Sequence, residues 1–196
     1  NTAIGYKALS ANTTSELNTA VGFEALDANT TGHSNTAIGA EALDANVTNS
    51  HNTAVGTNAL SASVADFNTA VGSNAGILIT TGTENVVLGG NALDANTTGS
   101  FNTAVGTSAL GANTTAANNT ALGAYALTAN TTGTSNTATG RSALGGNTTG
   151  NGNVAFGSYY VGNYNAPLAL NTTGSSNSAI GVGALSSNTT ASYNTG

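Results

Sequence analysis

The chain has 196 residues, of which 5% are charged and 5% are aromatic. Eight acidic residues against Lys7 and Arg141 give a net charge of −6, so no basic patch is available to bind the phosphates of nucleic acids. The absence of cysteine excludes disulfides and thiolate metal sites, and no apolar run approaches the roughly 20 residues of a membrane span.

One short unit is repeated along the whole chain. The consensus reads N-T-A-[IVL]-G-x-x-A-L-x-A-N-T-T-G-x-x, and its residues are numbered below as repeat positions 1 to 17. Nine of the eleven complete units have 17 residues, whereas the unit at Asn52 is one residue shorter and the unit at Asn153 is seven longer. Such a period is typical of a solenoid. Residues 1–196 are therefore predicted to form a single repeat solenoid, uncapped at both ends, with an insertion within 158–170.

The spacing of turn residues favours strands over helices. Gly at position 5 and Asn-Thr-Thr-Gly at positions 12–15 leave about five residues on either side, a length that suits strands. The sequence therefore predicts an all-β fold, a parallel β-solenoid of about eleven 17-residue coils with two short strands in each coil. The Gly at position 5 of every unit indicates a turn with positive φ or a close approach of two backbones.

Four repeat positions are predicted to fill the core. Position 4 is Ile, Val, Leu or Phe in all units but one, position 9 is Leu in nine units, and Ala dominates positions 3 and 8. Position 1 is always Asn, and amides stacked at one coil spacing can hydrogen-bond as a ladder. The predicted ladder comprises Asn1, Asn18, Asn35, Asn52, Asn68, Asn85, Asn102, Asn119, Asn136, Asn153, Asn177 and Asn194.

A second Asn column, at position 12, heads an N-x-[ST] sequon in nine units. The sequons predict a row of N-linked glycans along one edge of the rod, in a host that performs this modification. The alternative is turn chemistry, because Asn tolerates the left-handed region and Thr suits the edge of a strand. The candidate glycosylation sites are Asn12, Asn29, Asn46, Asn96, Asn113, Asn130, Asn147, Asn171 and Asn188.

Titratable residues are too sparse to predict an active site. His33 and His51 fall at positions 16 and 17, in the variable stretch between coils, and are predicted to be exposed. Asp27 and Asp44 share position 10 in adjacent units and form a weak candidate for calcium. We expect no catalytic residues, no metal site and no cofactor, and therefore a protein that is not an enzyme.

Two further features suggest interaction surfaces. Thr at positions 2, 13 and 14 would stack into hydroxyl arrays of the kind that ice-binding solenoids use, although Val86, Val154 and Ser178 interrupt the position 2 array. The long unit contains Tyr159, Tyr160 and Tyr164, and insertions in solenoids form surface loops that often bind partners.

The ends of the chain bear on assembly. Asn1 opens a unit, and residues 194–196 begin a twelfth. Open strand edges invite another chain to stack, which predicts either head-to-tail association of copies or a segment of a longer array. Both describe a fibre.

The N-T-A-[IV]-G-x-x-A-L core resembles the repeats of YadA-like heads of trimeric autotransporter adhesins and the Asn-Thr-Ala-Ile-Gly repeats of phage tail-fibre-like and bacterial surface proteins. The resemblance implies a left-handed parallel β-roll, often trimeric, at a cell or particle surface. It carries over only the Asn, Ala, Ile/Val and Gly columns, which are structural, and it supplies no catalytic residues.

The sequence as a whole predicts a structural subunit or segment of an extracellular fibre. Its expected partners are further copies of itself, with covalent glycans as a possible addition and neither nucleic acid nor a membrane span. The alternative function is an adhesin or tail-fibre shaft that binds a receptor through the tyrosine insertion, and ice binding is a more distant third.

Overall fold

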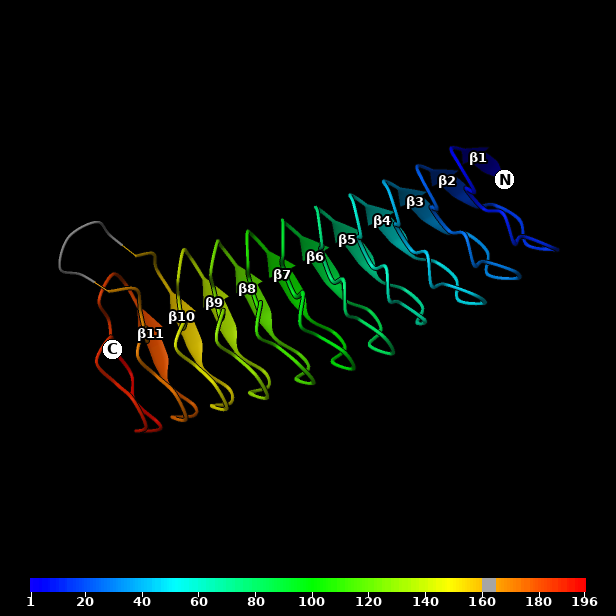
Figure 1. The fold of residues 1–196 in the computed structure, drawn as a ribbon. Helices are drawn as coiled ribbons and strands as arrows, with labels where there is room; N and C mark the ends of the chain where they lie inside the picture. Colours follow the sequence, from blue (N-terminus) through cyan, green and yellow to red (C-terminus); the bar gives the residue numbers. More distant parts are fainter. Residues whose placement is uncertain (160–164) are drawn as a thin grey trace.

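The computed structural model describes residues 1–159 and 165–196, which form an all-β solenoid (Figure 1). Eleven short strands lie side by side in one parallel sheet in chain order, and the described residues contain no helix. Each coil contributes one strand, so the coils are named by their strands below. The strands are β1 (Thr2–Ile4), β2 (Thr19–Val21), β3 (Thr36–Ile38), β4 (Thr53–Val55), β5 (Thr69–Val71), β6 (Val86–Leu88), β7 (Thr103–Val105), β8 (Thr120–Leu122), β9 (Thr137–Thr139), β10 (Val154–Phe156) and β11 (Ser178–Ile180).

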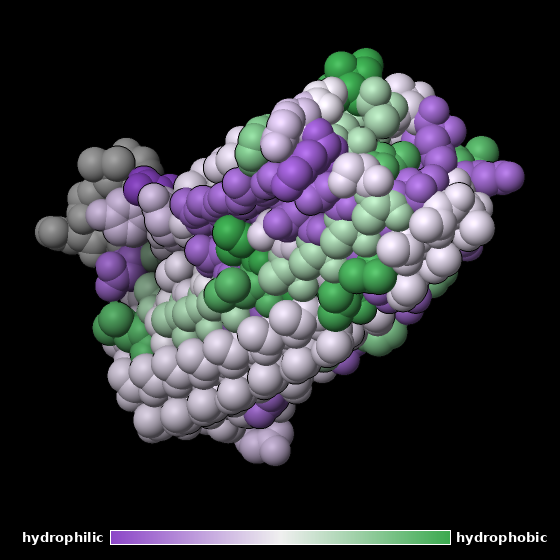
Figure 2. Space-filling model, turned by 45° about the vertical axis from the view of Figure 1, so that its right-hand side comes forward, coloured by the Kyte–Doolittle hydropathy of each residue, from purple (hydrophilic) through white to green (hydrophobic). Residues whose placement is uncertain are grey.

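Equivalent repeat positions stack directly on one another. Thr2 pairs with Thr19, Ala3 with Ala20, and the same register holds from β1 to β11. Figure 2 shows the consequence, because rows of residues with similar hydropathy run along the molecule. A side chain at one repeat position is therefore repeated along the rod at the strand spacing, about 4.8 Å.

The expectation of two strands per coil is wrong, because only positions 2–4 form a strand. Positions 6–11 form consecutive turns, yet their backbone still bonds to the neighbouring coils. The Leu9 nitrogen donates to the Ala25 carbonyl at 2.9 Å, and the Ala11 nitrogen donates to the Asp27 carbonyl at 3.1 Å. Hydrogen bonding between coils thus continues around the coil where extended structure does not.

Residues in the left-handed region explain why the second half of the coil is not extended. Three non-glycine residues per typical coil, at positions 7, 9 and 17, have φ near +55°, as Glu24, Leu26 and Ser34 do in the β2 coil. Each costs about 1–2 kcal/mol relative to the right-handed region. The backbone nitrogens at these positions donate to carbonyls of the coil above or below, so stacking stabilises a conformation that one coil alone would not hold.

The sequence left two explanations open for Gly at position 5, a positive φ or a close backbone approach, and the structure shows both. These glycines have φ between +113° and +143°, a region that side chains disfavour. A Cβ added at Gly39 would lie 2.5 Å from the carbonyl oxygen of Gly56 in the next coil. From Gly5 to Gly140 the backbones of neighbouring coils therefore approach too closely for any side chain, whereas Gly181 has no such neighbour.

Position 4 was predicted to be part of the core, and this is wrong. The core consists of Ala at positions 3 and 8 and Leu at position 9, whereas Ile38 is 40% exposed and Leu122 is 46% exposed. Successive side chains of a strand point to opposite faces, so with Ala at position 3 inside the coil, positions 2 and 4 must point outward. The sheet consequently has an apolar outer surface.

Truncation of Leu127 at position 9 and of Leu122 at position 4 should lower stability by different amounts, because one side chain is buried and the other is half-exposed. Leu127, at position 9, is fully buried, so Leu127→Ala is expected to lower the free energy of unfolding by about 2–5 kcal/mol. Leu122→Ala removes the same atoms from a half-exposed side chain, and a loss below about 1 kcal/mol is expected. Denaturant unfolding of both variants measures the difference, and equal losses would contradict this assignment of the core.

The β5 coil departs from the consensus at two positions that compensate for each other. Gly76 stands at position 9, which is Leu in nine units, and Ile79 stands at position 12, which is Asn in nine units. Ile79 is fully buried, and a Cβ at Gly76 would lie 2.8 Å from the Ile79 Cδ1 atom. Ile79 therefore fills the space that the missing leucine leaves.

Because Ile79 fills the space beside Gly76, the effects of Gly76→Leu and Ile79→Asn on the free energy of unfolding should not be additive. Gly76→Leu alone overpacks the β5 coil, and a loss of about 1–3 kcal/mol is expected. The double variant Gly76→Leu with Ile79→Asn restores the consensus pair and should recover most of that loss. Thermal or denaturant unfolding of the two single variants and the double variant measures the coupling. Additive losses would show that the two positions do not share one space.

Candidate functional site

The Asn side chains at position 1 form a ladder inside the coils. The Oδ1 atom of Asn18 accepts a hydrogen bond from the backbone nitrogen of Asn35 at 2.9 Å, and its Nδ2 atom donates to the Gly32 carbonyl at 2.8 Å. The same contacts recur from coil to coil, and these residues are buried from Asn18 to Asn177. Each amide thus links two coils and closes its own coil.

The Asn column at position 12 forms a second internal ladder, which sequence analysis missed. Asn130 donates from Nδ2 to the Asn113 Oδ1 atom at 3.0 Å and to the Gly133 carbonyl at 2.9 Å. Seven of the nine predicted glycosylation sites are fully buried in this way: Asn29, Asn46, Asn96, Asn113, Asn130, Asn147 and Asn171.

This burial corrects the prediction of a glycan edge. An N-linked glycan is attached to Nδ2, and at the seven buried sites this atom lies inside the coil and donates to the protein. The folded coil has no room for a sugar there. Asn12 and Asn188, in the first and last coils described, are only half-buried.

The position 12 ladder is interrupted between the β3 and β6 coils. Ser63 and Ile79 replace Asn there, and the short β4 coil lacks one residue. Among the described residues, the Asn46 Oδ1 and Ser63 Oγ atoms are buried without a hydrogen-bond partner. A buried polar group without a partner costs about 1–3 kcal/mol, so this part of the rod is held less strongly than the regular coils.

The threonines at positions 2, 13 and 14, which were predicted to form hydroxyl arrays, differ in their exposure to solvent and in their hydrogen bonds. At position 13, hydroxyls donate to the equivalent carbonyl of the next coil, as Thr114 does to Thr131 at 3.2 Å. At position 14, Thr115 and its equivalents are exposed. At position 2, threonines point outward from the sheet beside the apolar column at position 4.

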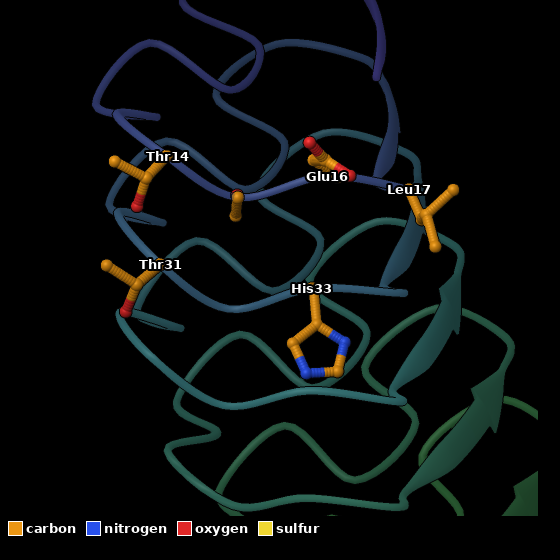
Figure 3. Close-up of a pocket in the computed structure, with 6 residues that line it drawn as sticks. Thr14, Glu16, Leu17, Thr31 and His33 are labelled. Atoms are coloured by element: carbon orange, nitrogen blue, oxygen red, sulfur yellow. The ribbon is translucent and has the colours of Figure 1, made fainter.

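The two histidines lie on the surface beside the sheet, in a run of rings. The rings of His33 and His51 are 5.0 Å apart edge to face, and His51 stacks on Phe67 at 5.0 Å. Figure 3 shows the adjoining hollow, where Thr14 and Thr31 point to the same side of successive coils and His33 lies near Glu16 and Leu17. A second hollow is lined by Phe67, Glu84 and Val86.

The aspartates at position 10 lie away from these rings. Asp27 accepts a hydrogen bond from the Ser10 hydroxyl and lies 4.0 Å from the Lys7 Nζ atom. Partial burial raises the pKa of Asp44 above its ordinary value, and the neighbouring Glu41 carboxylate raises it further. Burial also raises the pKa of Asp94. Within residues 1–159 and 165–196, no three His, Asp or Glu side chains gather closely enough to hold a metal ion.

These shifts predict an unusual response to acid. A carboxyl whose pKa is raised by folding binds its proton more readily in the folded state, so its ionisation weakens folding as the pH rises through the shifted pKa. The free energy of unfolding should therefore hold or rise slightly on acidification from neutral pH towards the ordinary aspartate pKa of 3.8. Denaturant unfolding across this range is the measurement, and Asp94→Asn should reduce the gain. A steep loss of stability would contradict the prediction.

The largest candidate site is the outer surface of the sheet, called the sheet face here. It comprises the outward side chains at positions 2 and 4 of β1–β11 and the flanking positions 17 and 6. Its exposed apolar members are Ile4, Tyr6, Leu17, Phe23, Ile38, Phe67, Val86, Leu88, Phe101, Leu122, Val154, Phe156, Ile180, Val182 and Tyr193. Contiguous exposed apolar surface is typical of interaction sites, so the sheet face is the candidate site considered below.

The tyrosine insertion is only partly described. Tyr159 is exposed, and the Arg141 guanidinium carbon lies 5.5 Å from the centre of its ring. Tyr160 and Tyr164 lie outside the described residues, so the predicted interaction of this loop stays a prediction.

Comparison with protein-family models, with characterised proteins and with solved structures finds no match to this chain. The described part of the chain has no helix long and apolar enough to cross a bilayer.

Proposed function

We propose that this chain is a structural shaft of a fibre, and that copies of it associate side by side through the sheet face. The observation that carries the proposal is the column of Ile, Val, Leu and Phe at position 4, which points outward along the sheet instead of filling the core. The column lies outside the buried Ala and Leu core, so core packing does not account for its apolar side chains.

The size of the sheet face supports association with another chain. Eleven strands at about 4.8 Å extend about 50 Å, and the six residue steps from position 17 to position 6 span at most about 20 Å. The face therefore offers up to about 1,000 Å² per copy, comparable with the roughly 800 Å² per partner of a standard interface. Burial of apolar surface would supply the free energy, at about 25 cal/mol per Å².

The coil supports the role of a shaft. Each coil presents to the next a similar set of backbone donors, the Asn amide of position 1 and the close Gly contact of position 5. A rod of this kind lengthens by further coils of one pattern, without a new interface. A place outside the cell, at a cell or particle surface, is part of the proposal and is supported by the resemblance of the repeat to those of surface fibres.

Sedimentation velocity of the purified chain tests the proposal. The expected result is a sedimentation coefficient that rises with concentration above that of an 18.9 kDa monomer, and rods of more than one chain in width by electron microscopy. A monomer at every concentration would overturn the proposal. Thermal hysteresis by such a monomer would instead favour ice binding through the Thr column at position 2.

A further inference from the structure

Charged residues are confined almost entirely to one half of the rod. All eight carboxylates and Lys7 lie within residues 1–94, which gives this half a net charge of −7, whereas Arg141 is the single charged side chain of residues 95–196. The charges of the first half are Lys7, Glu16, Glu24, Asp27, Glu41, Asp44, Asp66, Glu84 and Asp94. Stacking in one register converts this sequence asymmetry into an asymmetry along the rod.

Several of these carboxylates border the sheet face. Glu84 is at position 17 and lines a hollow with Phe67 and Val86, while Glu16 is at position 16 of the β1 coil and is exposed. On the other flank, Glu24 pairs with Lys7 at 3.0 Å, and Glu41 is exposed in the next coil. Beside β7–β11 the single charged residue of the sequence is Arg141, whose guanidinium lies over the Tyr159 ring.

The exposed fraction of the apolar side chains at position 4 is similar in the two halves of the rod, β1–β6 and β7–β11. Along β1–β6, Ile4, Ile38 and Leu88 are 61%, 40% and 47% exposed. Along β7–β11, Leu122, Phe156 and Ile180 are 46%, 56% and 71% exposed. The two halves of the sheet face therefore offer similar apolar surface and differ in the charge beside it.

We infer that the sheet face of β7–β11 carries most of the self-association of the shaft, and that its occupant is the sheet face of a second copy. The inference rests on the proposed function and assigns it to particular strands. When β1–β6 of one copy contacts β1–β6 of another, carboxylates of the two copies approach each other and some of them lose water. Both effects oppose binding. When β7–β11 of one copy contacts β7–β11 of another, the apolar columns come together and almost no charged group loses water. A strongly charged partner would find no opposite charge at these strands, whereas the uncharged face of a second copy matches them.

Two matched substitutions test the inference. Leu122→Gln and Ile38→Gln each place a neutral amide in the same column, at side chains of similar exposure on β8 and β3. Leu122→Gln is expected to weaken self-association about tenfold or more, and Ile38→Gln about threefold or less, as measured by sedimentation equilibrium. Unchanged unfolding midpoints of both variants show that the coils remain intact.

Neutralisation of the acidic half supplies an independent readout. The triple variant Glu16→Gln, Glu41→Gln and Glu84→Gln is expected to strengthen self-association, and added salt should do the same for the natural chain because it screens repulsion. Equal effects of Leu122→Gln and Ile38→Gln would overturn the inference while leaving the proposed function in place, as would weaker association of the triple variant. A monomeric natural chain at high salt would overturn the proposed function itself.

Discussion

Replacement of Asn102 by Ala is expected to lower the free energy of unfolding by about 3–5 kcal/mol, although the Asn102 side chain is polar and contributes little apolar surface. Its Nδ2 atom donates to the Ala116 carbonyl at 2.9 Å and to the Asn85 Oδ1 atom at 3.2 Å. Its Oδ1 atom accepts from the Asn119 backbone nitrogen at 3.0 Å. Alanine leaves buried partners on both sides without a hydrogen bond, at a cost of about 1–3 kcal/mol for each group.

Thr115→Ala is the control for this variant. Thr115 lies at position 14, close in sequence to Ala116, but its side chain is exposed. A change within about 0.5 kcal/mol is expected for an exposed substitution of this kind. Denaturant unfolding followed by circular dichroism measures both variants. Similar losses for Asn102→Ala and Thr115→Ala would show that the position 1 ladder contributes little to the stability of the rod.

Gly106→Ala is expected to be at least as damaging, for a steric reason. Gly106 has φ of +127°, and a Cβ there would lie 2.6 Å from the Gly123 carbonyl carbon and 2.7 Å from the Ala124 nitrogen. Both contacts are with backbone, which cannot move aside without separating two coils. A loss of more than about 4 kcal/mol, or failure to fold, is expected, because strain and broken hydrogen bonds between coils add to each other.

Gly90→Ala tests whether the effect belongs to the column or to glycine in general. At Gly90 the nearest atom to an added Cβ is the Ser73 carbonyl oxygen at 3.8 Å, and φ is not in the left-handed region. This variant is expected to fold with a stability equal to that of the natural chain or slightly higher, since Ala reduces the freedom of the unfolded chain. Thermal unfolding distinguishes the two variants. A destabilised Gly90→Ala protein would contradict the steric account.

Much of the architecture could be predicted from the period of the sequence. An invariant Gly at position 5 indicated either an unusual φ or a close backbone approach, and the structure has both. The spacing of turn residues predicted a second strand in each coil, and the turns that stand in its place at positions 6–11 could not be predicted from spacing alone. The left-handed conformation at Leu26 and at its equivalents is fixed by hydrogen bonds to neighbouring coils, which no propensity of leucine indicates.

The error at position 4 had a signal in the sequence itself. Asn18 at position 1 and Ala20 at position 3 both point inward, and strand geometry then requires Val21 to point outward. A buried Asn ladder and a buried position 4 are incompatible within one strand. The hydropathy of the Ile and Val column suggested a core because free monomers rarely expose such columns. The exposure of this column is the observation on which the proposed function rests.

The error at position 12 also left a trace. The β5 coil is the one in which Leu is lost from position 9 and the apolar Ile79 appears at position 12. This paired exchange indicates that position 12 points into the core beside position 9, as Asn130 does beside Leu127. The sequon pattern concealed it, because Asn-Thr-Thr satisfies a modification motif and an internal ladder equally well.

The central claim is that the shaft associates through its sheet face, and site-specific labelling of cysteine tests it most directly. The natural chain has no cysteine, so Thr137→Cys on β9 and Thr132→Cys at position 14 each introduce a single thiol at an exposed position. The account predicts that the Thr137→Cys thiol reacts more slowly with a maleimide as protein concentration rises, while the rate at the Thr132→Cys thiol stays constant. Equal rates at both thiols at every concentration would contradict it.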